Sequence, residues 1–171
     1  MIPGYLVSSP LGDIALRAED DALTGVFFVG QKYYPELALI SDERNVPRVI
    51  RLAQEQLSEF FAGQRRTFDV PLRFRGTPFQ EQVWRELARI PYGELLSYGG
   101  MAKKMGLSAG HSRAVGTANG KNPISIIVPC HRVIGASGDL TGYAGGVERK
   151  RALLALENSN GVAAFALANP R

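Results

Sequence analysis

The first third of the chain alternates short apolar runs with turn residues. Three runs, at 5–9 (YLVSS), 13–18 (DIALRA) and 24–30 (TGVFFVG), are separated by PLG and EDD, which is typical of β-strands joined by tight turns. Within 45–63 the apolar period becomes helical and Gly63 supplies a stop; the apolar positions are Ile50, Ala53, Leu57 and Phe60. This pattern predicts a small α/β unit with a β-meander and one helix.

A second helical pattern starts at residue 77. Thr77 fits an N-cap, Pro78 the first helical position and Gln80 the partner in a capping box. The apolar positions that follow share one helical face: Phe79, Val83, Leu87 and Ile90. We place a domain boundary near Gly76, which gives an N-terminal α/β domain of residues 1–75 and a C-terminal domain of residues 76–171.

Two short helices are predicted next, from Ser97 to about 105 and from Ser108 to about 118. The two serines are N-cap candidates and Gly106 is a stop. Two helices joined by a short turn with a glycine are a helix-turn-helix signature. The second helix carries one long cation, Arg113, among small residues that we expect to be exposed: Ala114, Gly116, Thr117 and Ala118. A slim helix can lie close to nucleic acid, and close helix packing with Arg113 in solvent is the alternative.

The apolar run 124–128 (ISIIV) predicts a buried strand that ends at Pro129, so Cys130 would follow where the strand leaves the core. Cys130 is the only cysteine, and His131 is one of two histidines. A lone cysteine is more often an inert core residue than a nucleophile. Here His131 and Arg132 offer a proton acceptor and a positive charge, which favour a thiolate. We therefore expect a reactive thiol.

Composition excludes several classes of protein. No apolar run approaches the roughly 20 residues of a membrane span, and the N-terminus lacks the pattern of a signal peptide. One cysteine cannot form an internal disulfide, so we expect a cytoplasmic protein. Net charge is −1 over residues 1–75 and +5 over residues 76–171. The C-terminal domain therefore favours a polyanionic partner, although a basic solvated surface explains the charge equally well.

The segment 118–135 (ANGKNPISIIVPCHRVIG), followed by GYAGG and RKRALLALE, resembles the O6-alkylguanine-DNA alkyltransferases. The resemblance is close over residues 76–158 and extends to residues 1–75 only in outline. It implies an α/β protein with an N-terminal ribonuclease-H-like α/β domain and a mainly helical C-terminal domain containing a helix-turn-helix and an active-site loop. Alkyltransferase-like relatives that bind lesions without repair lack the cysteine, so Cys130 favours an active enzyme.

The function implied is direct DNA repair. The alkyl group of O6-alkylguanine, and of O4-alkylthymine, in duplex DNA would pass to Cys130 in a single turnover, after the nucleotide flips out of the helix. The implied partner is double-stranded DNA that contains O6-alkylguanine, and not a membrane. The protein is expected to be a monomer, and cooperative assembly on DNA is left open. We expect no cofactor, and no metal because residues 1–110 contain neither cysteine nor histidine.

The resemblance also assigns catalytic roles. Cys130 would accept the alkyl group, His131 would take the thiol proton through a water, and Glu157 would orient His131. Tyr98 would donate a proton towards guanine N3 as the base leaves.

The remaining assignments concern binding. Asn122 would brace the turn before the active site, and four residues would line the base pocket: Val133, Tyr143, Ala144 and Gly145. Arg113 would fill the gap left by the flipped base. The rest of its helix would enter the minor groove through Ala114, Gly116 and Thr117.

Two other classes are compatible with the motif. A cysteine-histidine hydrolase would use the same pair and would show multiple turnovers. A non-enzymatic DNA-binding protein would use the helix-turn-helix alone and would not depend on Cys130.

Overall fold

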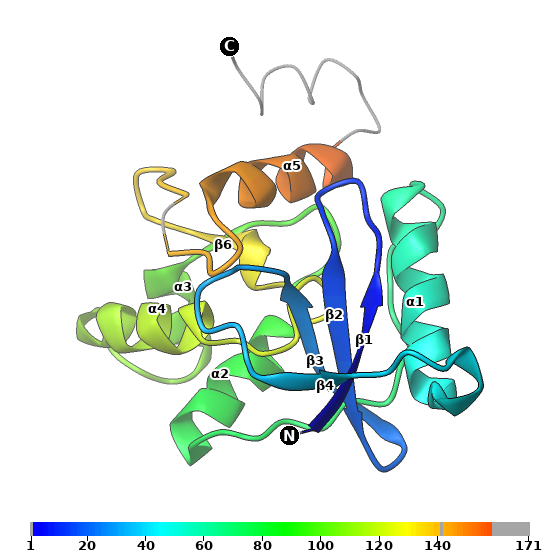
Figure 1. The fold of residues 1–171 in the computed structure, drawn as a ribbon. Helices are drawn as coiled ribbons and strands as arrows, with labels where there is room; N and C mark the ends of the chain where they lie inside the picture. Colours follow the sequence, from blue (N-terminus) through cyan, green and yellow to red (C-terminus); the bar gives the residue numbers. More distant parts are fainter. Residues whose placement is uncertain (1, 141, 159–171) are drawn as a thin grey trace. The chain divides into compact units, whose positions relative to one another are not determined.

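The computed structural model describes residues 2–140 and 142–158. The chain forms two compact units, Met1–Arg75 and Gly76–Arg171, and each is described by itself (Figure 1). The first unit is a sheet with a helix and the second is mainly helical, which confirms the expected mixed α/β class.

A four-stranded sheet forms the first unit, in the order β3-β2-β1-β4. Its strands are β1 (Ile2–Val7), β2 (Ile14–Glu19), β3 (Ala22–Phe28) and β4 (Leu37–Leu39). The first three are antiparallel, as the predicted meander requires, whereas β4 pairs with β1 in parallel. The sequence did not indicate β4, because it is three residues long and largely exposed, so it lacks an apolar alternation.

A short 3₁₀ helix, η1 (Glu43–Asn45), leads to α1 (Arg48–Phe61), which packs on β2 and β3. The apolar stripe predicted from the sequence is buried in full: Ile50, Ala53, Leu57 and Phe60. Gly63 follows the helix with a φ of +77°, in the left-handed region where glycine is favoured. Both the helix and its stop are confirmed.

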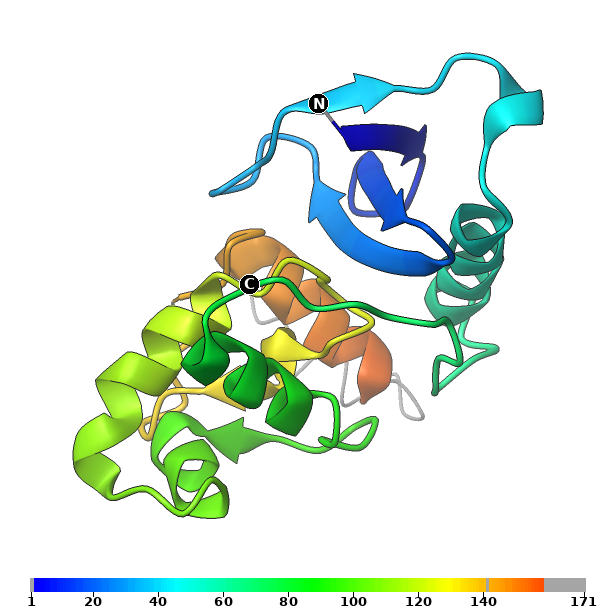
Figure 2. The same ribbon diagram turned by 90° about the horizontal axis from the view of Figure 1, so that it is seen from below.

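The second unit contains α2 (Pro78–Leu87), β5 (Leu96–Ser97), α3 (Tyr98–Lys104), η2 (Ala109–His111), α4 (Ser112–Gly120), η3 (Cys130–Arg132), β6 (Val133–Ile134) and α5 (Val147–Glu157). The capping box between Thr77 and Gln80 is present at the start of α2. Figure 2 shows α3 and α4 side by side, and α2 also packs on α4. Trp84 stabilises the contact between α2 and α4, because its indole Nε1 donates to the carbonyl of Ala118 at 2.9 Å.

Two predictions of secondary structure were wrong in this unit. The helix expected from Ser108 begins only at Ser112, because the 3₁₀ turn η2 precedes it and the Ser108 side chain caps nothing. Residues 124–128 are buried as predicted but form turns instead of a strand. Ile126 has a φ of +72°, which a β-branched residue rarely adopts, and a continuous strand cannot contain it.

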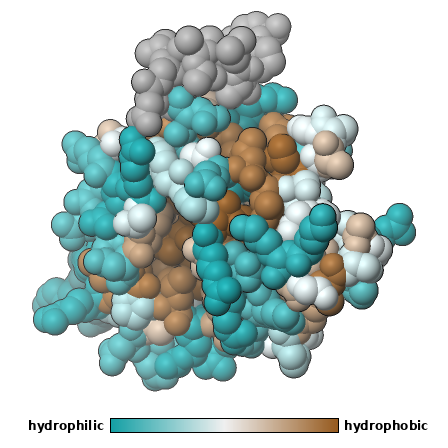
Figure 3. Space-filling model, turned by 180° about the vertical axis from the view of Figure 1, so that it is seen from behind, coloured by the Kyte–Doolittle hydropathy of each residue, from teal (hydrophilic) through white to brown (hydrophobic). Residues whose placement is uncertain are grey.

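Hydrophilic side chains cover much of the face seen in Figure 3, with apolar patches among them. Within the described residues, no helix is both long and apolar enough to cross a membrane.

Candidate functional site

Cys130 begins η3 and is 4% exposed. The turn that leads to it is held by the side chain of Asn122, whose Nδ2 donates to the Val128 carbonyl at 2.8 Å and whose Oδ1 accepts from the Ile124 amide at 3.0 Å. These bonds replace the ladder of a strand and hold Ile126 in its strained conformation. The chain therefore reaches the thiol through a turn that one amide side chain organises.

His131, Arg132 and Glu157 form one buried group. The imidazole Nε2 of His131 donates to Glu157 Oε2 at 2.7 Å. Arg132 donates to both oxygens of Glu157, each at 2.8 Å, and to the carbonyl of Ile90 at 2.6 Å. Burial raises the pKa of Glu157, but the hydrogen bonds from His131 and Arg132 and the charge of the guanidinium outweigh burial and lower the pKa to about 2. Glu157 is thus an anion that fixes the imidazole with its Nε2 protonated.

The other imidazole nitrogen, Nδ1, is buried and has no hydrogen-bond partner in the described part of the chain. With the proton on Nε2, this nitrogen carries the lone pair. Burial lowers the pKa of His131, with Glu157 acting in the opposite direction. A neutral imidazole with a free lone pair is a base that can take a proton.

The thiol itself is protonated at rest. Burial raises the pKa of Cys130 to about 11, although Asn122 and Lys150 act to lower it. At pH 7 about one thiol in ten thousand is then ionised. The expectation that the sequence neighbours of Cys130 favour a resting thiolate was wrong, because Arg132 is committed to Glu157 and burial outweighs the remaining charges.

Lys150 supplies the positive charge that the sequence interpretation had assigned to Arg132. It lies on α5, is 0% exposed, and donates from Nζ to the carbonyl of Val133 at 2.6 Å. The same nitrogen lies 6.0 Å from the ring centroid of Tyr98. Burial lowers the pKa of Lys150, and Cys130 and Asp139 raise it. A buried lysine on a helix of unremarkable amphipathicity has no local sequence signal, so sequence reasoning missed it.

Tyr98 reaches the site because two distant segments pair. Strands β5 and β6 are parallel, with Leu96 opposite Val133 and Ser97 opposite Ile134. This pairing brings Tyr98, the first residue of α3, to the segment that follows Cys130. Burial and the neighbouring Cys130 raise the pKa of Tyr98, so its hydroxyl stays protonated and can donate.

The residues expected to line a base pocket lie in β6 and in the segment before α5. Val133, Tyr143 and Gly145 are buried and Ala144 is half-buried. The Tyr143 hydroxyl interacts with Ser125, and the Tyr98 hydroxyl interacts with Asn119. His131 Nδ1 is buried here without a partner in the described residues.

The outer face of α4 carries the residues expected to meet DNA. Arg113, Ala114 and Thr117 are exposed, and the Thr117 hydroxyl donates to the Arg113 carbonyl at 3.0 Å. Gly116 is half-buried and faces inward, because a Cβ there would lie 3.6 Å from the ring of Tyr98. Ala118, expected to be exposed, is buried.

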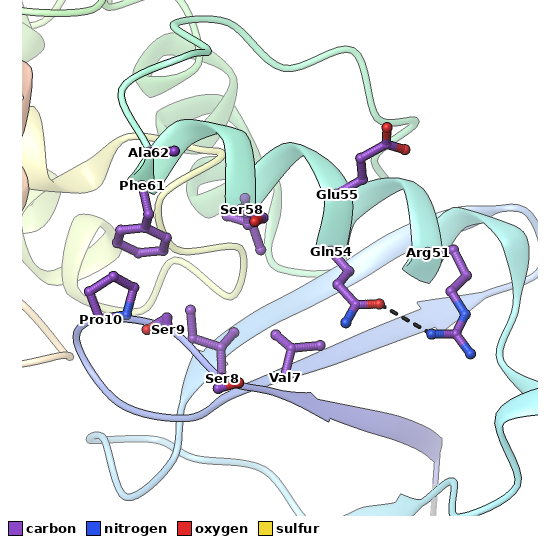
Figure 4. A pocket seen from close by; sticks show the side chains of 12 residues that line it. Val7, Ser8, Ser9, Pro10, Arg51, Gln54, Glu55, Ser58, Phe61 and Ala62 are labelled. Atoms are coloured by element: carbon purple, nitrogen blue, oxygen red, sulfur yellow. Dashed lines mark hydrogen bonds between the residues drawn. The ribbon is translucent and has the colours of Figure 1, made fainter.

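Elsewhere in the described residues, no group of three or more metal-binding side chains comes together. A groove of about 610 Å³ lies in the first unit between α1 and the β1–β2 turn (Figure 4). Its one arginine, Arg51, is already bound to Gln54, Tyr5 and Glu43, and the groove contains none of the site residues of the second unit.

A buried cysteine followed in sequence by a histidine that a buried carboxylate fixes is typical of a cysteine-dependent transferase or hydrolase. Two family models match the chain: the ribonuclease-like domain of 6-O-methylguanine DNA methyltransferase over residues 4–74 and its DNA binding domain over residues 78–159. The chain therefore belongs to the 6-O-methylguanine DNA methyltransferase family, and its first unit is the expected ribonuclease-like domain.

Individual relatives agree. The methylated-DNA–protein-cysteine methyltransferase of Mycolicibacterium paratuberculosis is 49% identical over 167 residues, which cover 98% of this chain and 99% of that protein. The protein of the same name from Methanosarcina acetivorans is 47% identical over 156 residues, 90% of this chain and 97% of that protein. Among solved structures, Mycobacterium tuberculosis OGT in complex with DNA has a TM-score of 0.84 at 46% identity, covering 98% of this chain and 100% of that chain.

Proposed function

We propose that this protein repairs DNA by moving the alkyl group of O6-alkylguanine irreversibly to Cys130, once per molecule. The observation that carries the proposal is the series from Cys130 through His131 to Glu157, in which a neutral imidazole is fixed with its lone pair free in the same buried site as the thiol. A resting thiol needs such a base. Family membership supports the same chemistry, since the relatives named above act on methylated DNA and a cysteine.

The transfer is a single displacement. The thiol proton passes to Nδ1 of His131, through a water as the resemblance implies, and the negative charge of Glu157 stabilises the imidazolium. The sulfur then forms a bond to the alkyl carbon while the bond from that carbon to O6 breaks, and its electron pair stays with the base. Tyr98 donates a proton to guanine N3, so the base leaves neutral, and Tyr98 then regains a proton from the imidazolium of His131, so the thiol proton ends on the base. The product is a thioether, which has no carbonyl for water to attack.

One hydrogen bond and two positive charges oppose the cost of ionising the buried thiol. Asn122 and Lys150 both lower the pKa of Cys130, and His131 becomes a cation only while the thiol is ionised. Burial keeps these interactions strong, because no bulk water screens them. The thiol of Cys130 therefore becomes reactive when a substrate lies in line with its sulfur.

Base flipping is part of the proposal because a buried sulfur cannot reach an O6 atom inside a stacked duplex. The buried polar side chains of Ser125 and Tyr143 support a site for a planar polar ligand. The exposed Arg113 on α4 is proposed to fill the gap in the duplex, with Ala114 and Thr117 against the DNA. O4-alkylthymine is proposed as a second substrate, because it carries the same alkyl–oxygen bond.

One experiment separates the candidate functions. The protein is incubated with a duplex that contains O6-methylguanine, and the intact mass and the Cys130 peptide are measured. We expect one added methyl group on Cys130, no second turnover, and no methyl on Cys130→Ser, which should still bind the duplex. Repeated turnover would indicate a hydrolase, and lesion binding by wild-type protein without any mass change would indicate a non-enzymatic DNA-binding protein.

A further inference from the structure

The stretch of chain that contains the helix-turn-helix has no acidic residue. Residues 95–138 include neither aspartate nor glutamate, and α3, η2 and α4 all lie within them. The same residues include five cations: Lys103, Lys104, Arg113, Lys121 and Arg132. A surface that binds a polyanion needs this separation, because a carboxylate close to a phosphate would repel it. The separation therefore favours a polyanionic partner for α3 and α4 over a surface of mixed charge that contacts only water.

The cations of the second unit differ in whether they have partners. Most of them donate to a carboxylate or to a main-chain carbonyl of the same unit: Arg85, Arg89, Arg132, Arg149, Lys150 and Arg151. The side chains of Lys103, Lys104 and Arg113 are exposed and have no hydrogen bond or ion pair within the described residues. A cation of this kind can neutralise a phosphate without first losing an ion pair. These three side chains are therefore available to a polyanion.

Lys103 and Lys104 occupy the last turn of α3, which packs beside α4 (Figure 2). In helix-turn-helix proteins the second helix enters a groove of the duplex and the first helix crosses the sugar-phosphate backbone. Arg113 and the outer face of α4 are already proposed to enter the groove, so the end of α3 remains for the backbone. Tyr98 begins α3, and the two lysines lie about 8–9 Å farther along the helix axis. That distance corresponds to roughly two or three base steps of about 3.4 Å.

A role in the fold is the alternative. Cations in the last turn of a helix interact favourably with its terminal carbonyl groups, and both lysines lie in that turn. An interaction of this kind would contribute to the free energy of unfolding and would be independent of DNA. Stability and DNA binding, measured on the same variants, therefore distinguish the two roles.

We infer that Lys103 and Lys104 bind the phosphate backbone of duplex DNA beside the damaged nucleotide and supply affinity for undamaged DNA. This inference rests on the proposed function and divides DNA binding between two parts of the helix-turn-helix. Arg113 acts where the nucleotide has left the duplex, whereas the lysines hold the duplex whatever its sequence. Phosphates repeat along every duplex, so binding through them allows the protein to slide along DNA until it meets a lesion.

The test measures the affinity for a labelled undamaged duplex by fluorescence anisotropy, over about 0.05–0.3 M salt. Wild type is compared with Lys103→Gln/Lys104→Gln and with Lys103→Arg/Lys104→Arg. Each phosphate contact contributes about 0.9 to the slope of log affinity against log salt concentration, so the Gln variant should flatten the slope by about 1.8 and lose at least about tenfold in affinity at about 0.1 M salt. The Arg variant keeps both charges and should bind within about twofold of wild type.

Arg85 and Arg89 supply a matched control. The variant Arg85→Gln/Arg89→Gln also removes two charges from the second unit, but from side chains that already pair with Glu81 and Glu86. It should keep the wild-type slope and bind within about twofold of wild type. The Lys103→Gln/Lys104→Gln variant should unfold at the wild-type temperature and react with free O6-benzylguanine at the wild-type rate, because both lysines are exposed.

An unchanged slope in Lys103→Gln/Lys104→Gln overturns the inference, and so does an equal loss in the arginine control, because binding would then depend on net charge alone. A lower unfolding temperature together with a slower reaction of the free base would assign the lysines to the fold and would also overturn it. If wild type acquires one methyl on Cys130 from a duplex with O6-methylguanine, only this inference fails. If Cys130 acquires no methyl, the proposed function fails.

Discussion

Replacing Glu157 by Gln tests whether the buried carboxylate stabilises the second unit as well as orienting the imidazole. Glu157 is 4% exposed and accepts two bonds from Arg132, one from His131 and one from the amide of Gly93 at 3.3 Å. The neutral amide introduced by the substitution can still accept from the imidazole, but it cannot neutralise the guanidinium. The variant therefore leaves a buried cation without its counter-charge.

The magnitude follows from the pKa. Glu157 has a pKa of about 2 in the folded protein and 4.5 as the reference value, and each unit corresponds to about 1.4 kcal/mol. Its ionised form thus contributes about 3 kcal/mol to the free energy of unfolding, in line with the roughly 3–5 kcal/mol lost when one partner of a buried ion pair is removed. Because the folded pKa is the lower one, this contribution is complete above about pH 4.5 and is lost as the pH falls towards 2, with about 2 kcal/mol gone by pH 3.

The fluorescence of Trp84 provides an unfolding assay that is specific for the second unit. This residue is the only tryptophan of the chain, is 2% exposed, and belongs to the second unit, so its fluorescence reports unfolding of the unit that contains the site. Urea unfolding of wild type and Glu157→Gln is followed at pH 7, 5 and 3.5. We expect a difference of about 3 kcal/mol at pH 7 that narrows at pH 3.5.

Glu148 on the same helix supplies the control. It pairs with Arg151 at 3.3 Å, and its side chain is 87% exposed, so Glu148→Gln should change the free energy of unfolding by less than about 0.5 kcal/mol. A Glu157→Gln variant as stable as the Glu148→Gln control, or a difference that stays constant from pH 7 to 3.5, would refute the assignment of a stabilising buried anion.

Three further substitutions have distinct outcomes. Arg113→Ala should slow alkyl transfer from duplex DNA at least about tenfold yet leave the reaction with free O6-benzylguanine unchanged; equal slowing on both substrates would contradict the gap-filling role. Lys150→Met should raise the pKa of Cys130 further, seen as a shift to higher pH in its alkylation by iodoacetamide, and an unshifted profile would exclude the charge effect. Gly142→Ala should reduce transfer far more than Gly138→Ala, because both glycines have φ near +87° (+88° and +86°) but only the added Cβ at position 142 meets a side chain, at 3.2 Å; similar losses would attribute the effect to backbone strain alone.

Sequence reasoning succeeded where the signal is local. The capping box of Thr77 and the stop at Gly63 depend on a few neighbouring residues, and both are present. The run 124–128 was predicted to be a strand because its residues are apolar. Apolar residues indicate burial, but they do not determine the backbone conformation. The amide of Asn122 decides the conformation instead, by taking the bonds that a partner strand would supply.

Electrostatic partners at the site were harder to predict. Arg132 follows the reactive cysteine closely in sequence, yet it binds a carboxylate 25 residues away. Lys150 acts on the thiol from another helix, and neither its position nor its burial follows from periodicity. Only the tertiary structure shows which cation pairs with which anion. The resemblance to a family, in contrast, was sufficient to single out the cysteine, the histidine and the glutamate.

The protonated state of Cys130 has a consequence for the lifetime of the protein. Under the proposed single-turnover reaction, a molecule is lost whenever another electrophile or an oxidant reaches its sulfur first. Oxidation and adventitious alkylation both proceed through the thiolate, which burial suppresses by holding the pKa at about 11. The slow chemistry of the resting thiol therefore preserves the stock of unreacted molecules until a damaged base is in place.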